Sequence, residues 1–316
     1  MDDKKSNRSF TGYVGLFFSG FLVGAANVIP GVSGGTMAFV LGIYEELLES
    51  IRCFTLVETW KMLLRFRIKQ AYRALPWPFL LCLMLGIAAA SLLLAKPITW
   101  MLKNRLPFIL AFFFGLVAAS VITVLCRLGK FRMMLIPALL AGTAVGWWVA
   151  GLTGGMQSPP ETWWYLVLCG AVAVCAMILP GISGSFILML MGRYSTVMEA
   201  IGGLAALKNF GAKLWTLGCF LIGVVAGLAS FVRLLSWTFK RFRYFTIAVL
   251  AGFMVGSLRK IWPWKVGNDL DNGNILPDLD RGFWIALVWL VAGFVLVLAI
   301  EFAARRFEKR SVSAAE

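Results

Sequence analysis

Two short segments place proline, glycine and hydroxyl side chains inside apolar sequence. Residues 27–36 read NVIPGVSGGT, and residues 178–185 read ILPGISGS. Proline and glycine interrupt a helix, so each segment predicts a broken backbone with a new helix starting near the serine. The first N–H groups of a helix favour an anion, and glycine lets a ligand approach the backbone. The residues predicted to bind such an anion are Pro30, Gly31, Ser33, Gly34, Gly35 and Thr36, then Pro180, Gly181, Ser183, Gly184 and Ser185.

A broken helix inside a bilayer is tolerated where protein buries it or where it lines a cavity. Two such breaks that meet near the membrane midplane would form a polar pocket for a phosphate or a carboxylate. The alternative is that Pro-Gly only turns a tight hairpin and that the serine only caps the next helix. Neither segment has the lysine of a nucleotide P-loop, so ATP hydrolysis is not expected.

Three charged residues in apolar surroundings are further candidates, because a charge inside a membrane is costly. Arg193 follows the second segment, at the position where the first half has Ile43. It either recognises a ligand or simply extends to the membrane interface. Glu49 and Glu199 lie beyond the segments, 13 and 14 residues after their last positions. They are candidates for proton or cation coupling, and a plain location at the water interface is the alternative.

The two segments belong to an internal repeat that extends well beyond them. A shift of 150 positions aligns Gly42, Tyr44, Glu49 and Ile51 with Gly192, Tyr194, Glu199 and Ile201. A shift of 137 positions aligns Gly86, Trp100, Lys103 and Gly115 with Gly223, Trp237, Lys240 and Gly252. The two tyrosines are predicted to be anchors at the membrane interface. Each half therefore contains one broken helix hairpin followed by three membrane spans.

The composition predicts an all-α polytopic membrane protein. Of 316 residues, 60% are hydrophobic and 14% are charged, whereas soluble domains contain about 45–50% apolar and 25% charged residues. The net charge of +15 is carried mainly by residues that flank apolar spans. Orientation in the membrane and contact with anionic lipid headgroups explain this charge better than nucleic acid binding does.

Several classes of site are not expected from this sequence. It has six cysteines, no CxxC motif and no histidine. Histidine-dependent nucleophilic catalysis is therefore excluded, and a structural zinc site or a disulfide framework is not expected. No cofactor is predicted.

The distribution of basic residues predicts the orientation of the chain. Most of the 30 lysines and arginines fall on one side if both termini are cytoplasmic and each hairpin returns to its starting side. Three full crossings in each half then give the halves opposite orientations, as in many secondary transporters. We expect residues 36–51 to form one helix, and residues 96–106 and 236–243 to connect spans. The predicted parts are a tail (1–9), the first inverted repeat (10–151), an extracytoplasmic linker (152–162), the second inverted repeat (163–303) and a second tail (304–316).

The paired PGVSGGT and PGISGS segments, with Gly-Ile-Tyr-Glu and Gly-Arg-Tyr after them, resemble a bacterial membrane family. That family was long known only as a domain of unknown function and is now associated with polyprenyl-phosphate translocation. The resemblance covers roughly residues 12–303, and it is the paired segments that are specific. It implies a non-enzymatic transporter in the bacterial cytoplasmic membrane that returns undecaprenyl phosphate, the carrier lipid of cell-wall precursors, to the inner leaflet. At every motif position this chain has the residue that is typical of the family.

The resemblance leaves alternatives that differ in substrate and in class. The first is a transporter or channel for a small soluble anion that uses the same paired segments. The second is an enzyme that acts on a lipid phosphate, and the third is a scaffold that transports nothing. Under each alternative the protein lies among membrane lipids, and the sequence does not predict its oligomeric state or its coupling ion.

Overall fold

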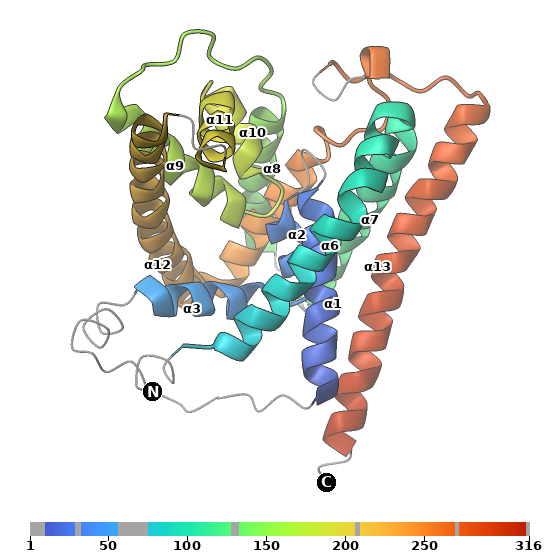
Figure 1. The fold of residues 1–316 in the computed structure, drawn as a ribbon. Helices are drawn as coiled ribbons and strands as arrows, with labels where there is room; N and C mark the ends of the chain where they lie inside the picture. The colour runs from blue at the N-terminus through green and yellow to red at the C-terminus, as the bar shows by residue number, and fades with distance from the viewer. Residues whose placement is uncertain are drawn as a thin grey trace.

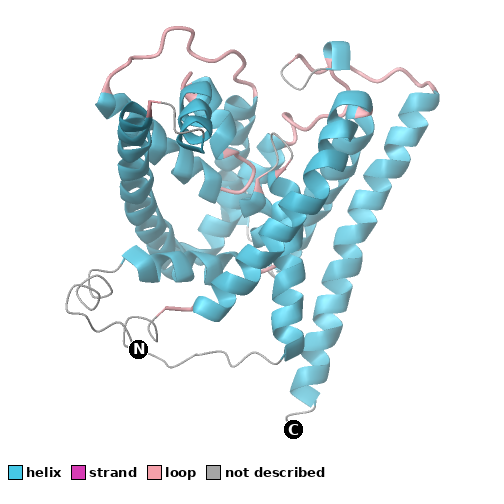
Figure 2. Cartoon of the chain, viewed as in Figure 1, coloured by secondary structure: helices cyan, strands magenta, loops and turns pink. Residues whose placement is uncertain are grey.

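The chain is helical in every part that the computed structural model describes, apart from loops and one isolated bridge between Lys265 and Asn274 (Figure 2). The described residues are 10–28, 33–55, 75–127, 133–205, 209–268 and 272–313. Five helices among them are long and apolar enough to cross a membrane, at Trp77–Asn104, Leu106–Cys126, Met133–Ala150, Phe210–Ser257 and Arg281–Phe302. The chain is therefore a multi-pass membrane protein. Pro30, Gly31 and the predicted tail at 1–9 lie outside the described residues.

The two halves present corresponding elements in the same order, with α12 of the second half corresponding to α6 and α7 of the first (Figure 1). The first half contains α1 (Phe10–Asn27), α2 (Gly34–Val40), α3 (Tyr44–Thr55), α6 (Trp77–Asn104), α7 (Leu106–Arg127), the short η1 (Met133–Leu135) and α8 (Ile136–Ala150). The second contains α9 (Trp163–Ile178), α10 (Gly184–Leu190), α11 (Tyr194–Ala205), α12 (Phe210–Ser257), η2 (Val266–Asn268) and α13 (Arg281–Ser313). The helices α2 and α3 match α10 and α11 residue for residue at the predicted shift of 150 positions.

The prediction of a single helix over 36–51 is wrong, because the backbone turns between α2 and α3. Gly42 has φ +72°, and Gly192 between α10 and α11 has φ +70°. Glycine reaches this left-handed conformation without the clash that a Cβ would cause. Each hairpin therefore ends in a seven-residue helix that a glycine turn separates from a second, amphipathic helix.

The predicted connections at 96–106 and 236–243 are also largely helical. The helix α6 continues to Asn104, and α12 runs through 236–243 with one non-helical residue. That residue is Phe242, with φ −135° and ψ 47°, and Arg105 between α6 and α7 has φ −143° and ψ 42°. These two breaks are 137 positions apart, so the repeat extends to the backbone conformation at the turn.

Glycines bring the helices of each half into backbone contact at matching positions. Gly86 on α6 faces the carbonyl of Phe17 on α1, and Gly223 on α12 faces the carbonyl of Val167 on α9. A Cβ at either glycine would collide with that carbonyl oxygen. Small residues allow this close packing of membrane helices.

The last helix of each half packs against the other half. The helix α8 lies along the final part of α12, and α13 lies along α7. Glycines again mark these contacts, since Gly142 faces the Val249 carbonyl and Gly293 faces the Phe112 carbonyl. Each half is thus packed against the last helix of the other, and the short helix α2 contacts α9 of the second half (Figure 1).

Candidate functional site

The first motif is capped and buried by its own neighbours. Ser33 is the N-cap of α2, and its hydroxyl accepts a hydrogen bond from the Gly35 amide at 3.1 Å. The Gly34 amide donates to Oδ1 of Asn27 at 2.9 Å. These are two of the first free N–H groups of α2, which the sequence predicted to face an anion. Protein side chains already satisfy both of them in this state.

The two motifs contact each other directly. The Gly181 amide donates to Oγ1 of Thr36 at 2.8 Å. The Ser33 hydroxyl donates toward the carbonyl oxygens of Leu179 at 3.4 Å and Met177 at 3.5 Å. Side chains of the first motif therefore hold the broken backbone of the second. The structure brings Ser33, Thr36 and Gly181 together, as expected for paired segments.

Tyr44, which follows the first motif, also contacts the second motif, and the prediction that it anchors the chain at the membrane interface is wrong. Its side chain is buried, and its hydroxyl donates to the carbonyl oxygen of Ile178 at 3.0 Å. The carbonyl of residue 178 lacks its usual helical partner because Pro180 and Gly181 end the helix there. The tyrosine supplies that hydrogen bond from the other half of the chain.

The second motif is more accessible than the first. Ser183 is the N-cap of α10, but its side chain makes no capping hydrogen bond. Its hydroxyl instead lies 2.8 Å from the hydroxyl of Ser185, and the Ser185 side chain is exposed. Ser33 and Thr36 are buried by comparison. In this state, a ligand would meet the hydroxyls of the second motif before those of the first.

A cation lies beside the second motif at Lys260, which the sequence analysis did not identify. A small pocket of about 10 Å³ is lined by Gly181 and Ser183 of the motif, by Phe186 on α10, by α8 and by Lys260. Lys260 is buried, and its Nζ lies 4.4 Å from the centre of the Phe186 ring. In the sequence this lysine looks like an ordinary loop residue after a membrane span. Only the packing of the turn after α12 against α10 shows where it lies.

Arg193 does not lie in this pocket. Its Nη2 donates to the carbonyl oxygens of Pro159, at 3.3 Å, and of Pro160. Its Nη1 donates to the Thr196 hydroxyl at 3.4 Å. The guanidinium therefore attaches the linker between the two halves to the start of α11.

The two candidate glutamates differ sharply in their surroundings. Glu49 lies on α3 at the edge of a cavity of about 450 Å³ that is lined by Glu45, Ser236, Lys240 and Arg243 among others. Glu199 on α11 is exposed and has no ion pair within the described residues.

Near Glu49, the Cys53 thiol has a raised pKa, chiefly because of burial and then because of the Glu49 carboxylate. This thiol is a poor nucleophile at neutral pH.

Comparisons with known proteins show the family of the chain. A family model described as undecaprenyl phosphate translocase-like matches residues 23–274. The chain belongs to this family. A polyprenyl-phosphate transporter of Vibrio cholerae is 38% identical over 309 residues, which cover 92% of this chain and 96% of that protein. A polyprenyl-phosphate transporter of Staphylococcus aureus is 27% identical over 293 residues, which cover 89% and 93% of the two chains. No solved structure matches the chain.

Both motifs of this translocase-like chain fall within the matched residues 23–274. The same is true of Tyr44, Lys240 and Lys260. The family relationship and the contacts between the motifs therefore concern the same part of the molecule.

Proposed function

We propose that this protein moves undecaprenyl phosphate from the outer to the inner leaflet of the bacterial cytoplasmic membrane by alternating access. The observation that carries the proposal is the direct pairing of the two broken motifs through Thr36 and Gly181. The names of the two relatives support a polyprenyl phosphate as the substrate. The protein acts as a transporter and not as an enzyme.

The headgroup binds first at the second motif. A phosphate monoester needs hydrogen-bond donors and a positive charge. Ser183, Ser185 and Lys260 offer these groups on one side of α10. Their pocket is too small for a phosphate in this state, so binding requires α8 or α10 to move. The isoprenoid tail stays in the lipid outside the helices.

The two halves act as inverted repeats with both termini in the cytoplasm. The matching glycine contacts and the matching breaks at Arg105 and Phe242 support a repeated unit. Each half crosses the membrane an odd number of times, which supports opposite orientations of the two halves in the membrane. Because Ser33 and Thr36 are buried while Ser183 and Ser185 are more accessible, the phosphate passes from the second motif to the first as the halves rock.

The test is transbilayer movement of undecaprenyl phosphate in liposomes that contain the purified protein. A reagent that cannot cross the membrane modifies headgroups in the outer leaflet only and so reports movement between the leaflets. We expect the wild type to accelerate movement and the double variant Ser33→Ala/Ser183→Ala to lose most of this acceleration. Ser230→Ala is the matched control, because the Ser230 hydroxyl bonds only carbonyls of its own helix.

Three other outcomes would contradict the proposal in different ways. Uptake of inorganic phosphate without lipid movement would identify a transporter of soluble anions. Release of phosphate from the lipid would identify a phosphatase. Lipid movement that the serine variant retains in full would leave the transport activity in place but would overturn the assigned site.

A further inference from the structure

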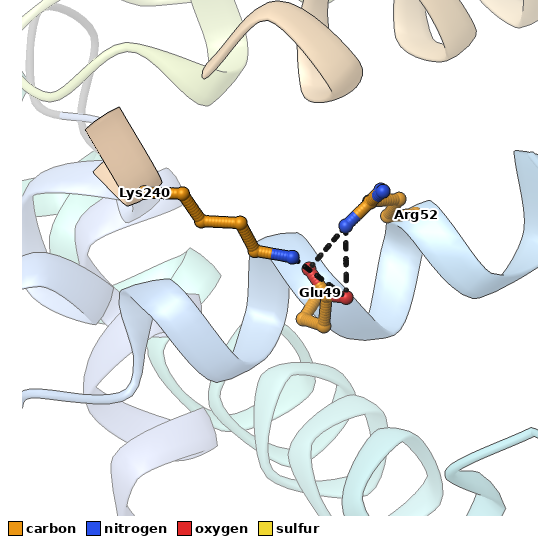
Figure 3. A network of polar contacts seen from close by, with 3 residues as sticks. All are labelled: Glu49, Arg52 and Lys240. Carbon is orange, nitrogen blue, oxygen red and sulfur yellow. Dashed lines mark hydrogen bonds and ion pairs between the residues drawn. The ribbon is translucent and has the colours of Figure 1, made fainter. Parts of the chain in front are cut away.

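Ion pairs join α3 to α12 at one end of the molecule. The Nη2 atom of Arg243 lies 2.8 Å from Oε1 of Glu45, and Nζ of Lys240 lies 3.8 Å from Oε1 of Glu49. Arg52 contacts the same Glu49 carboxylate at 3.1 Å (Figure 3). The helix α3 belongs to the first half of the chain and α12 to the second, so this contact joins one repeat to the other.

Apolar packing accompanies the ion pairs at this end. The side chains of Tyr44 and Leu48 on α3 are each 2% exposed. The ring of Tyr44 lies 6.0 Å from the ring of Phe239 on α12, measured between centroids. The helix α3 therefore packs on α12 on both sides of the break at Phe242, beside the cavity of about 450 Å³.

The repeat assigns an equivalent partner to each member of this contact, at the opposite end of the molecule. The shift of 150 positions relates Glu49 to Glu199 on α11, and the shift of 137 positions relates Lys240 to Lys103 on α6. Both α11 and the junction of α6 with α7 lie at the upper end in Figure 1, whereas α3 lies at the lower end. An acid on a hairpin helix and a base on a long helix thus occur at both ends.

The equivalent contact is not formed in this structure. Glu199 and Lys103 are both exposed, and neither has an ion pair within the described residues. Tyr194 is 36% exposed and Met198 is 48% exposed, although their counterparts Tyr44 and Leu48 are buried. The main helix contacts of α11 are with α12 and α10, not with α6. The contact between a hairpin helix and a long helix of the other half is therefore formed at one end of the molecule and not at the other.

We propose that Glu199 and Lys103 form an ion pair in the opposite state of the transport cycle, in which α11 docks on the end of α6 and α3 releases α12. The proposal rests on alternating access, and it names the contact that replaces the one between Glu49 and Lys240. Each ion pair is exposed and therefore weak. This suits a contact that has to open in every cycle, since neither state is then held too strongly.

Proximity of the two pairs can be measured without any transport. In a chain whose six native cysteines are replaced, one variant carries Glu49→Cys with Lys240→Cys, and a second carries Glu199→Cys with Lys103→Cys. A short bifunctional thiol reagent tests each pair in membranes. The control pair is Glu199→Cys with Lys96→Cys, because Lys96 lies on the same helix seven residues, or about 10 Å, from Lys103.

We expect the first pair to cross-link readily and the second to cross-link more slowly, but faster than the control pair. Adding Glu45→Gln removes an ion pair from the contact between α3 and α12 and shifts the population toward the opposite state. It should raise cross-linking of the second pair by about threefold or more and lower that of the first. Equal cross-linking of the second pair and the control pair, with or without Glu45→Gln, would overturn the proposal.

Charge exchange in the native chain gives a second measurement that does not depend on the cysteine-free variant. Glu199→Lys and Lys103→Glu should each slow lipid movement, and the double exchange should restore at least about half of the wild-type rate, because it restores the pair. No recovery in the double exchange would overturn the proposal. Cross-linking as expected in a protein that moves no polyprenyl phosphate would refute the proposed substrate and leave the exchange of contacts in place.

Discussion

Thr36 and Gly181 connect the two motifs through a hydrogen bond of 2.8 Å, in which the glycine amide donates to the threonine hydroxyl. The threonine is buried, and the glycine follows the break of the second motif. A backbone amide at a break has no helical partner. The first half of the chain therefore supplies a hydrogen bond that the second half needs.

Replacing Thr36 with valine should destabilise the protein, because valine keeps the shape and removes the acceptor. The partly buried Gly181 amide would then lose its partner, at a cost of up to about 1–3 kcal/mol. Thermal unfolding in detergent measures the effect. Thr36→Ser keeps the acceptor and should lie closer to the wild type. Equal loss of stability in both variants would mean that methyl packing, and not the hydrogen bond, holds the motifs together.

Gly181→Ala should be strongly destabilising for two reasons. Gly181 has φ +90°, and a Cβ there would lie 2.8 Å from the carbonyl oxygen of Phe253. Overpacking of this kind typically costs about 1–3 kcal/mol, in addition to the backbone strain. Gly154→Ala separates the two effects, because Gly154 has φ +77° but nothing within 4 Å of its Cβ position. We expect a clearly lower unfolding temperature for Gly181→Ala than for Gly154→Ala.

The repeat could be predicted from the sequence because glycine and proline mark positions where the backbone needs a special conformation or a close contact. Gly42 and Gly192 share a left-handed turn, and Gly86 and Gly223 share a close contact with a neighbouring helix. Few other residues satisfy such requirements, so both copies keep the same residue type. The family relationship and the membrane class followed from the same positions and from composition.

The role of individual side chains could not be predicted in the same way. Tyr44 binds the carbonyl of Ile178, 134 positions away, and nothing in the local sequence indicates this contact. Lys260 has the appearance of a loop residue until the turn that carries it packs against Phe186. The basic residues in 236–243 suggested a connection outside the membrane, whereas the structure shows a helix whose Lys240 and Arg243 lie beside glutamates on α3.

Tyr44→Phe should weaken the contact between the motifs, because it removes the hydroxyl that donates to Ile178 and leaves the ring in place. A single buried hydrogen bond contributes about 0.5–1.5 kcal/mol to stability. The matched control is Tyr194→Phe, since Tyr194 is the repeat partner of Tyr44 and is exposed. Chemical denaturation of both variants checks the prediction. Equal stability of the two variants would contradict a structural role for the Tyr44 hydroxyl.

Lys260→Gln tests whether the cation beside the second motif recognises the phosphate. Glutamine keeps most of the side-chain length and removes the charge. A hydrogen bond from a charged donor contributes about 1.5–3 kcal/mol, so we expect the lipid concentration that gives half-maximal transport to rise about tenfold or more. Lys260→Arg should retain most of the affinity because it keeps the charge. Arg281→Gln is the control for loss of a surface cation, because Arg281 is exposed at the start of α13.

The unfolding temperature of Lys260→Gln has to be measured beside its transport, since Lys260 also packs on Phe186. If the lipid concentration for half-maximal transport rises and the unfolding temperature does not change, Lys260 binds the headgroup. If the unfolding temperature falls and the lipid concentration for half-maximal transport does not change, Lys260 instead contributes to the packing of α10. The arginine variant separates the two roles, because it retains the positive charge but fills the space beside the ring differently.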